Sequence, residues 1–465
     1  MKPIIKPLEL KLGAEQVFAK IQQHRPCFWL DSAMTHPQRG AWSYLGFNPF
    51  LKIRFRSGWF EVDGIRQESF ASQSPIPVLR KYLSEFQIPA PDPQFPFSGG
   101  TVGYLGYELG NYLERIPFQR TDDLKLFELC FDFYQFALGF HHPSASWYLL
   151  GIEDDGLDLD TENYLGQLLK ILERDQADFA EEKFSDYVQS NFSRQTYFQA
   201  LLKAQEYIRA GDIYQVNLTQ RFNSGYQGDP YHLYQRLRRL NPASYAGALL
   251  YPQFAILSSS PELFLRVRDR EVITRPIKGT RPRGNTSEED EKLKTELLAS
   301  EKDLAELAMI VDLERNDLGR VCDYGSVKVL GFPEPETYSR VHHLVATVFG
   351  KLAKGKDVFD LLRASFPGGS ITGAPKVRAM EIIDELEPNA RGPYTGSLGW
   401  IGFSGNLELN IAIRIILLKN GRAYFPAGGG IVYDSDPELE YQESWTKAKA
   451  LWEALSGKEV ERLKG

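Results

Sequence analysis

Cysteine is scarce in this sequence. Three residues, Cys27, Cys130 and Cys322, lie far apart in a chain of 465, and no CxxC pair or Cys/His cluster occurs. We therefore expect neither a disulfide scaffold nor a structural zinc site. Long hydrophobic runs are missing as well. The longest uncharged stretch, 240–261, is interrupted by prolines and predicts two buried strands rather than a membrane helix.

An excess of positive charge is also missing. Lys and Arg number 54 against 61 Asp and Glu, a net charge of −7. This balance excludes a nucleic-acid binder that relies on bulk positive charge. The first residues are broken by lysine and proline and do not resemble a signal peptide, so we expect a reduced, cytoplasmic and soluble protein.

Apolar and aromatic residues are plentiful, at 43% and 13%, which is enough for a large core. The length corresponds to two or three domains of ~150 residues, or to one large α/β unit. Residues 1–150 contain short alternating segments typical of strands, such as 50–55 and 146–152. An acidic stretch follows, and we place a junction at 151–192 and a second domain at 193–460.

The second domain has clearer periodicity. Helices are predicted over 194–210, from about Thr286 onward, and from about Asp436 onward, each with residues suited to begin or end it. Segment 271–281 is strand-like. Segment 407–418 predicts one continuous strand, with Leu409, Ile411, Ile413, Ile415 and Leu417 on one face and Asn410, Ala412 and Arg414 on the other.

Two pairs of acidic residues occur at i, i+3 spacing on predicted helices: Asp303 with Glu306, and Glu440 with Glu443. Carboxylates from two such helices are what a Mg²⁺ site needs, because that ion prefers oxygen ligands completed by substrate and water. The alternative is that each pair lies on a solvated helix face. The apolar residues after Asp303 favour a partly buried position for Glu306.

Two glycine-rich segments stand out. Segment 367–376 precedes a predicted helix but lacks the lysine spacing of a P-loop, so it predicts a loop that leads into a helix N-terminus and is suited to a carboxylate. Segment 427–431 follows a strand and can offer successive backbone N–H groups to an anion. Tight turns with close packing are the alternative for both.

Three further side chains are suited to chemistry. Lys278 lies on a strand-like segment among apolar residues, where burial would lower its pKa and free the amine as a nucleophile. Glu262 is a single carboxyl among apolar residues, as a general acid would be. His342 and His343 include at least one inward-facing imidazole. A surface lysine, an ordinary strand-end glutamate and a core histidine are the alternatives.

The order of these segments resembles that of a known family. Segments 276–280 (PIKGT), 309–318 (MIVDLERNDL), 366–376 (FPGGSITGAPK) and 427–432 (AGGGIV) are similar to those of the chorismate-utilising enzymes. This family includes anthranilate, aminodeoxychorismate, isochorismate and salicylate synthases. The resemblance implies an α+β fold in which two large antiparallel sheets pack face to face with helices outside.

Two positions point to a branch of the family. Gln215 stands where isochorismate and salicylate synthases have a water-activating lysine, so this chain resembles the ammonia users. Lys278 stands where anthranilate synthases typically have alanine. The PIKGT form resembles the aminodeoxychorismate synthase branch, which serves para-aminobenzoate and folate synthesis.

The resemblance also implies roles for individual residues. Lys278 would be the nucleophile at C2 of chorismate and Glu262 the proton donor to the C4 hydroxyl. Glu306 and Glu443 would bind Mg²⁺, with Asp303 and Glu440 beside them. Residues implied in substrate binding are Gln215, Thr280, His343, Thr372, Tyr394, Arg414, Gly428, Gly429, Gly430 and Lys447.

A partner and a second pocket follow from the same resemblance. Ammonia would come from a separate glutaminase subunit, because none of the three cysteines lies in the Gly-x-Cys-x-Gly setting that activates a nucleophilic thiol. Segment 29–32 is similar to the region where anthranilate synthases bind tryptophan, with Asp31 in place of the usual glutamate. A residual amino-acid pocket beside Ser32 is a hypothesis.

Other readings stay open. Anthranilate synthase component I differs in losing pyruvate and aminating C2, and a lysine bound at C2 would block that amination. A subunit that senses chorismate or an amino acid, or a structural partner of a glutaminase, would not need Glu262, Lys278, Glu306 and Glu443, and all four are present.

Overall fold

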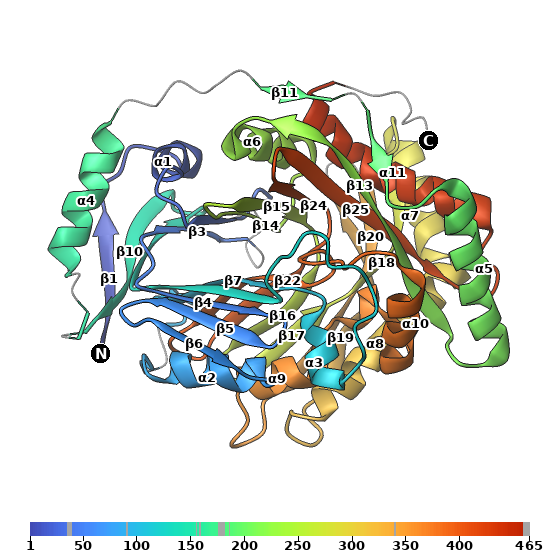
Figure 1. Cartoon of the computed structure of the whole chain (residues 1–465), viewed down its shortest axis with the longest axis horizontal. Coiled ribbons are helices and arrows are strands. Elements are labelled where there is room, and N and C mark those ends of the chain that lie inside the picture. Colours follow the sequence, from blue (N-terminus) through green and yellow to red (C-terminus); the bar gives the residue numbers. More distant parts are fainter. Residues whose placement is uncertain are drawn as a thin grey trace.

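The computed structural model describes residues 1–34, 40–89, 92–154, 156–157, 160–174, 182–185, 187–338 and 341–458. Within these residues, antiparallel strands form two large sheets (Figure 1). The first sheet has 13 strands. In spatial order these are β1 (Lys2–Leu8), β10 (Ser146–Glu153), β9 (Phe136–His141), β3 (Trp42–Phe47), β2 (Cys27–Asp31), β14 (Tyr245–Leu250), β15 (Phe254–Ser260), β24 (Ile415–Lys419), β25 (Arg422–Ile431), β13 (Gln215–Gln227) and β11 (Lys183–Phe184), with β12 (Gln189–Ser190) and β21 (Gly373–Ala374) also paired to β13.

The second sheet has 12 strands in the described part of the chain. In spatial order these are β18 (Ile277–Pro282), β20 (Val341–Lys351), β17 (Glu271–Arg275), β16 (Leu263–Arg268), β23 (Leu407–Ile411), β22 (Ser397–Gly402), β7 (Gly100–Leu105), β8 (Leu129–Tyr134), β4 (Leu51–Arg56), β5 (Trp59–Gly64) and β6 (Glu68–Ala71), with β19 (Lys328–Thr337) also paired to β20.

Helices cover the outer faces of both sheets. They are α1 (Ala14–Ile21), α2 (Pro75–Ser84), α3 (Leu109–Glu114), α4 (Thr161–Glu173), α5 (Arg194–Ala210), α6 (Pro230–Leu240), α7 (Ser287–Leu298), α8 (Glu301–Gly319), α9 (Val358–Ser365), α10 (Lys376–Leu386) and α11 (Pro437–Ser456), together with a 3₁₀ turn, η1 (Gly369–Ile371). The helices α1, α4, α6 and α11 pack on the first sheet, and α2, α8 and α9 pack on the second (Figure 1).

The two sheets pack face to face. A buried cluster between them takes Tyr44 and Ile256 from the first sheet and Tyr104 and Trp400 from the second. Removing such large apolar surfaces from water is the main favourable contribution to folding. The fold class predicted from the sequence is therefore confirmed.

The two predicted domains share both sheets. Each sheet contains strands from before residue 154 and strands from after residue 214. The predicted regions 1–150 and 193–460 therefore form one interleaved core, and the helix α4 lies in the stretch 151–192 that we predicted as a junction. The boundaries themselves stay predictions.

Several predicted helices have the predicted ends. The helix α5 spans Arg194–Ala210, the Ser193 hydroxyl accepts a hydrogen bond from Thr196 N–H, and Gly211 ends the helix at φ +82°. A serine N-cap and a left-handed glycine after the last turn are the usual devices for these positions. The helices α7 and α11 likewise begin after the side-chain caps Thr286 and Asp436.

The single strand predicted over 407–418 is wrong. Its first half is β23, in the second sheet, and its second half is β24, in the first sheet. The chain crosses between the sheets at 412–414, where Ile413 N–H bonds to Ile411 O and Arg414 has φ +51°. Apolar residues continue through both halves, so the pattern did not reveal the crossing. Similarly, Pro276 divides the predicted strand 271–281 into β17 and β18.

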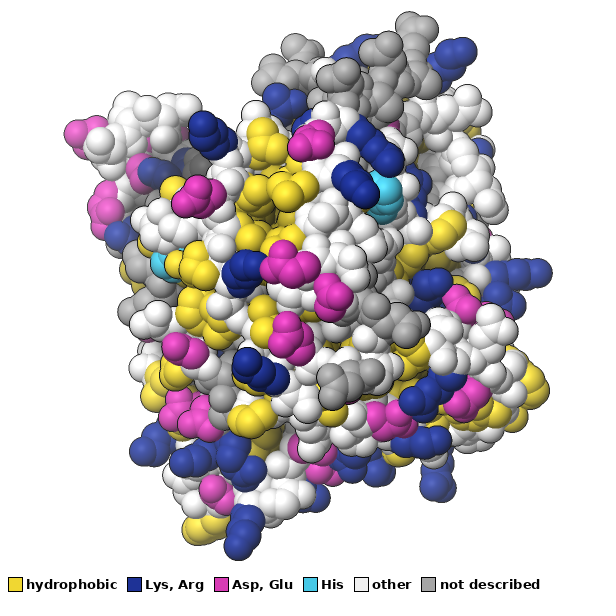
Figure 2. Space-filling model, turned by 90° about the vertical axis from the view of Figure 1, so that its left-hand side faces the viewer, with side chains coloured by type: hydrophobic (Ala, Val, Ile, Leu, Met, Phe, Trp, Pro, Cys, Tyr) yellow, Lys and Arg dark blue, Asp and Glu magenta, His cyan; other side chains and the backbone are white. Residues whose placement is uncertain are grey.

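Figure 2 shows the side of the molecule that carries β1, α1 and α4. Hydrophobic side chains form a broken band on this face, divided by charged side chains of both signs. Among the described residues, no helix has the length and hydrophobicity needed to cross a membrane.

Candidate active site

Lys278 and Glu262, the two residues predicted to do chemistry, meet at Ser370. The Nζ of Lys278, on β18, donates a 3.2 Å hydrogen bond to the carbonyl oxygen of Ser370 in η1. The Ser370 hydroxyl donates a 2.6 Å bond to Oε1 of Glu262, which follows β15. One serine of the glycine-rich segment thus contacts both side chains.

Burial changes the pKa of both groups. The Glu262 side chain is buried, which raises the pKa of Glu262 to about 7, although the bond from Ser370 and the charge of Lys278 act in the opposite direction. Burial lowers the pKa of Lys278, opposed by the carboxylates of Glu306 and Glu262. A carboxyl that holds its proton near neutral pH and an amine that releases its proton more readily are the forms suited to acid and nucleophile.

Three predicted residues of α11 converge on Gly429. A Cβ atom at Gly429 would lie 3.1 Å from Glu440 Oε2, 3.8 Å from Lys447 Nζ and 3.9 Å from Glu443 Oε1. Lys447 Nζ pairs with Glu443 Oε1 at 2.7 Å and donates to the Gly428 carbonyl at 2.9 Å. The lack of a side chain at Gly429 is what gives these groups room beside β25.

The other acidic pair comes from α8. Asp303 lies against Gly279, next to Lys278, and pairs with Arg281 at 3.1 Å. Among the charges that favour the protonated form of Lys278, the carboxylate of Glu306 has the largest effect. The two helices α8 and α11 therefore bring their carboxylates to the same lysine, because Glu443 also acts on the pKa of Lys278.

The donor set fits Mg²⁺ in its chemistry. All four candidate ligands, Asp303, Glu306, Glu440 and Glu443, are carboxylates, and Mg²⁺ needs only one or two of these because water and substrate complete its shell. In the described parts of the chain, no three acidic, histidine or cysteine side chains converge closely enough to form a cage by themselves. The side chain of Glu443 is 53% exposed and so remains accessible.

The glycines of segment 427–431 form part of a strand, not the turn or loop that the sequence suggested. They belong to β25 and pair with β13, with Gly428 opposite Thr219 and Gly430 opposite Asn217. A Cβ at Gly430 would lie 2.0 Å from Nε2 of Gln215. Because successive residues of a strand face opposite sides, Gln215 and the α11 group approach β25 from different faces.

Gln215 and His343 carry buried polar atoms with no partner in the described structure. Both Nε2 and Oε1 of Gln215 are unpaired. His343 Nδ1 lies 2.8 Å from the Thr280 hydroxyl, while its Nε2 is unpaired. Burial lowers the pKa of His343 to about 3, so the ring is neutral. Such atoms are costly unless a ligand or water satisfies them, which favours a binding role.

The remaining predicted substrate residues come from other elements. Arg414, at the crossing between β23 and β24, lies near the charge of Glu262, while burial lowers its own pKa. Burial raises the pKa of Tyr394 to about 12, and Thr219 is among its neighbours. The Thr372 hydroxyl donates to the Gly368 carbonyl at 3.0 Å, so it shapes the glycine-rich segment.

Ser32 lines a separate small cavity with Trp42, Tyr44 and Trp400. Its hydroxyl donates to the Trp42 carbonyl at 2.8 Å. The neighbouring Asp31 carboxylate is already paired with Arg238 at 2.8 Å. The ammonium group of an amino acid bound in this cavity would therefore need an acceptor other than Asp31.

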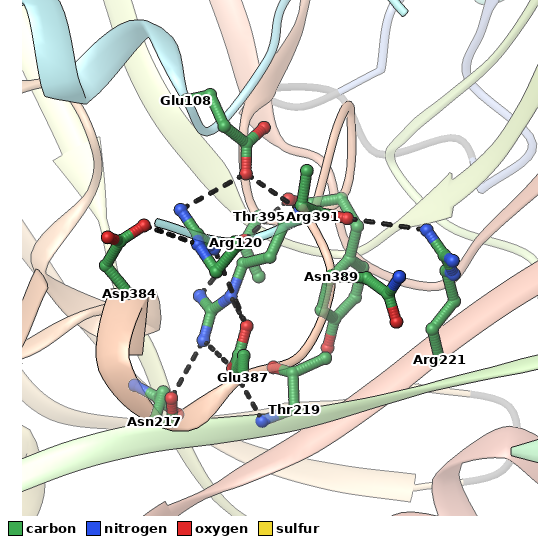
Figure 3. A network of polar contacts seen from close by, with 12 residues as sticks. Glu108, Arg120, Asn217, Thr219, Arg221, Asp384, Glu387, Asn389, Arg391 and Thr395 are labelled. Atoms are coloured by element: carbon green, nitrogen blue, oxygen red, sulfur yellow. Dashed lines mark hydrogen bonds and ion pairs between the residues drawn. The ribbon is translucent and has the colours of Figure 1, made fainter. Parts of the chain in front are cut away.

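The sequence did not single out Ser370, Asn217 or Arg391. Asn217 lies on β13 and donates through Nδ2 to the Ser370 carbonyl at 3.0 Å. Figure 3 shows Arg391 between Glu387 and Asn217, within a buried network that also contains Arg120. The contacts of Ser370 with Glu262 and of Asn217 with Ser370 span 108 and 153 positions, and the sequence carries no local signal for them.

Comparisons with known proteins agree with this geometry. A profile of the family described as chorismate binding enzyme matches residues 25–453. The chain is 38% identical to aminodeoxychorismate synthase component 1 of Bacillus subtilis over 459 residues, 96% of this chain and 95% of that protein. It is 39% identical to anthranilate synthase component 1 of Thermus thermophilus over 440 residues, 94% of each chain.

Solved structures show the same architecture. Anthranilate synthase component I from Streptococcus pneumoniae superposes with a TM-score of 0.78 at 33% identity, covering 90% of this chain and 93% of that one. The menaquinone-specific isochorismate synthase of Escherichia coli superposes with a TM-score of 0.73 at 19% identity, over 98% of this chain and 94% of that one, a likeness of fold alone.

Proposed function

Because this chain belongs to the family of chorismate binding enzymes, we propose that it is component I of an aminodeoxychorismate synthase. It would convert chorismate and ammonia to 4-amino-4-deoxychorismate, on the route to para-aminobenzoate and folate. Both this branch and the anthranilate branch occur among its relatives at similar identity, so the choice rests on the site.

The observation that carries the proposal is the placement of Lys278. Its amine lies 3.2 Å from the Ser370 carbonyl, and the hydroxyl of the same serine binds the carboxyl of Glu262. A partly buried amine of lowered pKa beside a carboxyl that is protonated near neutral pH is a nucleophile paired with an acid.

The proposed reaction exchanges two groups at C4 of chorismate. The neutral Lys278 amine forms a bond to C2, the ring double bonds shift, and the C4–O bond breaks. Glu262 protonates the departing hydroxyl, which leaves as water. Ammonia then attacks C4, the double bonds shift back, and the C2–N bond to Lys278 breaks, which restores the lysine. The enolpyruvyl group stays on the ring.

Binding would involve the groups around β25 and α11. The carboxylates of chorismate would be bound by Arg414, Tyr394, Lys447 and the backbone of Gly428–Gly430. Its ring would be lined by Gln215, Thr280, His343 and the Thr372 segment. Glu306 and Glu443 would hold Mg²⁺, with Asp303 and Glu440 beside them. When bound, Mg²⁺ supplies positive charge that withdraws electron density through the ring carboxylate.

Ammonia would come from a separate glutaminase subunit. The relatives are named as component 1 of their synthases. The three cysteines of this chain are buried, and burial raises the pKa of Cys27 and Cys130 to about 12, which is the reverse of an activated thiol. We further propose that the protein acts in the cytoplasm, as its composition suggests.

Mass spectrometry of the product tests the proposal. Purified protein is incubated with chorismate, Mg²⁺ and ammonium at mildly alkaline pH. We expect aminodeoxychorismate that retains the enolpyruvyl group. Anthranilate with free pyruvate would instead assign the chain to the anthranilate branch. Binding of chorismate without turnover, also after addition of a glutaminase subunit, would indicate a sensing subunit.

A further inference from the structure

A buried arginine outside the predicted site contacts the segment that carries Ser370. Arg391 lies in the loop between α10 and β22, and its side chain is 1% exposed. Figure 3 shows its guanidinium between Glu387 and the strand β13. A charge so deeply buried is costly to keep unless each of its donors is satisfied.

All five N–H donors of Arg391 have an acceptor. Two bonds reach the carboxylate of Glu387, from Nε to Oε2 at 2.9 Å and from NH2 to Oε1 at 2.6 Å. NH2 also donates to the Asn217 carbonyl at 2.8 Å. NH1 donates to the Ile371 carbonyl at 3.1 Å and to the Thr395 hydroxyl at 3.2 Å. The planar guanidinium therefore sets the spacing between β13 and η1.

Asn217 completes the same junction. Its backbone N–H donates to the Thr372 carbonyl at 2.8 Å, and its side-chain amide donates to the Ser370 carbonyl at 3.0 Å. Together with Arg391, these bonds connect residues 370–372 to β13 through three successive carbonyls. The Ser370 carbonyl is the one that also accepts from Lys278.

We infer that Arg391 is a positioning residue for the reaction, acting through η1 on Lys278 and Glu262. The guanidinium touches neither of these side chains. It fixes Ile371, and the adjacent Ser370 sets the direction of the Lys278 amine and of the Glu262 carboxyl. The inference rests on the proposed function for the roles of those two residues.

Lysine cannot replace this arginine. Its ammonium has three donors on a flexible stem, so it cannot bind Glu387, Asn217 and Ile371 in one plane. The conservative variant Arg391→Lys therefore keeps the charge that Glu387 needs while removing the fixed spacing.

The same network offers a matched control. Arg120 is equally buried and bonds through Nε to Asp384 at 2.8 Å, with Glu108 at 3.3 Å and Glu387 at 3.7 Å. Figure 3 shows it on the side of the network away from β13. Its contact with Glu387 is longer than the 2.6 and 2.9 Å bonds that Arg391 makes to the same carboxylate. Arg120→Lys therefore disturbs a buried guanidinium of the same network, keeps a positive charge near Glu387 and does not touch residues 370–372.

The test compares the two variants with the parent protein by steady-state kinetics and by hydrogen exchange of the peptide 369–373. For Arg391→Lys we expect kcat to fall by about tenfold or more, the KM for chorismate to change by less than about threefold, and exchange of this peptide to accelerate. Arg120→Lys should leave all three close to the parent values.

An equal loss of kcat in both variants would overturn the inference, because it would show a general structural role. A raised KM with unchanged kcat, or unchanged exchange in 369–373, would also overturn it. If Arg391→Lys does not fold, Glu387→Gln weakens the same clamp and must lower kcat in the same direction, and an unchanged kcat would contradict the inference. The proposed function is tested separately, because it is contradicted if the parent protein forms anthranilate instead of aminodeoxychorismate.

Discussion

The hydroxyl of Ser370 donates a 2.6 Å hydrogen bond to Oε1 of Glu262, although 108 positions separate the two residues in the chain. Glu262 is buried, and burial raises its pKa to about 7 even though this bond favours the carboxylate. The same residue accepts from Lys278 through its backbone carbonyl. Substitution of the side chain therefore affects the proposed acid and leaves the contact to the proposed nucleophile.

We predict that Ser370→Ala lowers kcat by about tenfold, because a hydrogen bond to a charged or charging group contributes roughly 1.5–3 kcal/mol. The pKa of Glu262 should rise further, since the bond that favours its carboxylate is lost. Steady-state kinetics over a range of pH values measures both effects.

Ser365→Ala is the control for this change. Ser365 is also buried, and its hydroxyl bonds to the Leu361 carbonyl of its own helix. Equal losses of activity in the two variants would mean that Ser370 has no special relation to Glu262.

The rate at which chorismate forms an adduct with Lys278, measured without ammonia, should depend on two protons. Loss of the Lys278 proton should raise the rate, and loss of the Glu262 proton should lower it. Below about pH 7 Glu262 carries its proton, and the rate should rise with pH because more Lys278 becomes neutral. Above that pH the loss of the Glu262 proton offsets this gain, and the rate should level off. The rate levels off in this way whenever the pKa of Lys278 is higher than the pKa of Glu262.

Glu262→Gln cannot lose a proton. Its rate should be lower by a factor of about 10²–10⁴, the usual contribution of a general acid, and should continue to rise beyond pH 7. A variant whose rate still levels off near pH 7 would assign that titration to another group.

A buried ion pair should stabilise the elements behind the site. Lys376 Nζ, at the start of α10, bonds to Asp317 Oδ2 of α8 at 2.5 Å, and both side chains are 9% exposed. Asp317→Ala leaves the ammonium buried with no carboxylate and only the Ser365 carbonyl as acceptor, which should cost about 3–5 kcal/mol of unfolding free energy. Denaturant unfolding followed by fluorescence measures the loss.

The exposed pair of Asp312 with Arg315 on the same helix is the control. Asp312→Ala should change the unfolding free energy by less than about 0.5 kcal/mol. Losses of similar size in the two variants would contradict the distinction between buried and exposed pairs.

The cavity beside Ser32 remains a predicted amino-acid pocket. Tryptophan at about a hundred times its dissociation constant should stabilise the protein by about 2.7 kcal/mol and raise its melting temperature. Indole, which lacks the amino and carboxyl groups, should give a smaller shift. An unchanged melting temperature with tryptophan would contradict the prediction of an amino-acid pocket beside Ser32.

Local chemistry explains which parts of the fold the sequence predicted. The helix α5 is bounded by Ser193 and Gly211, whose side chain and backbone freedom end a helix in any context. The crossing at Arg414 was not predicted, because neither glycine nor proline marks it and apolar residues continue on both sides. Only the packing of the two sheets shows that β23 and β24 belong to different sheets.

The same limit applies to the site. Lys278 and Glu262 were found because each is a charge among apolar residues. The segment of Lys278 also resembles that of a family, and the resemblance implied the roles of both residues. Arg391 and Asn217 act on the site through backbone carbonyls 20 and 153 positions away. Every residue has a backbone carbonyl, so a sequence pattern cannot indicate which carbonyls accept these hydrogen bonds.

Intact-protein mass spectrometry after incubation with chorismate and Mg²⁺, in the absence of ammonia, tests the central claim most directly. The account predicts a mass increase equal to chorismate less one water, located on Lys278 by peptide mapping, discharged by added ammonium and absent from Lys278→Ala. Ammonia-dependent turnover of chorismate with no adduct on Lys278, or with full activity in Lys278→Ala, would contradict it.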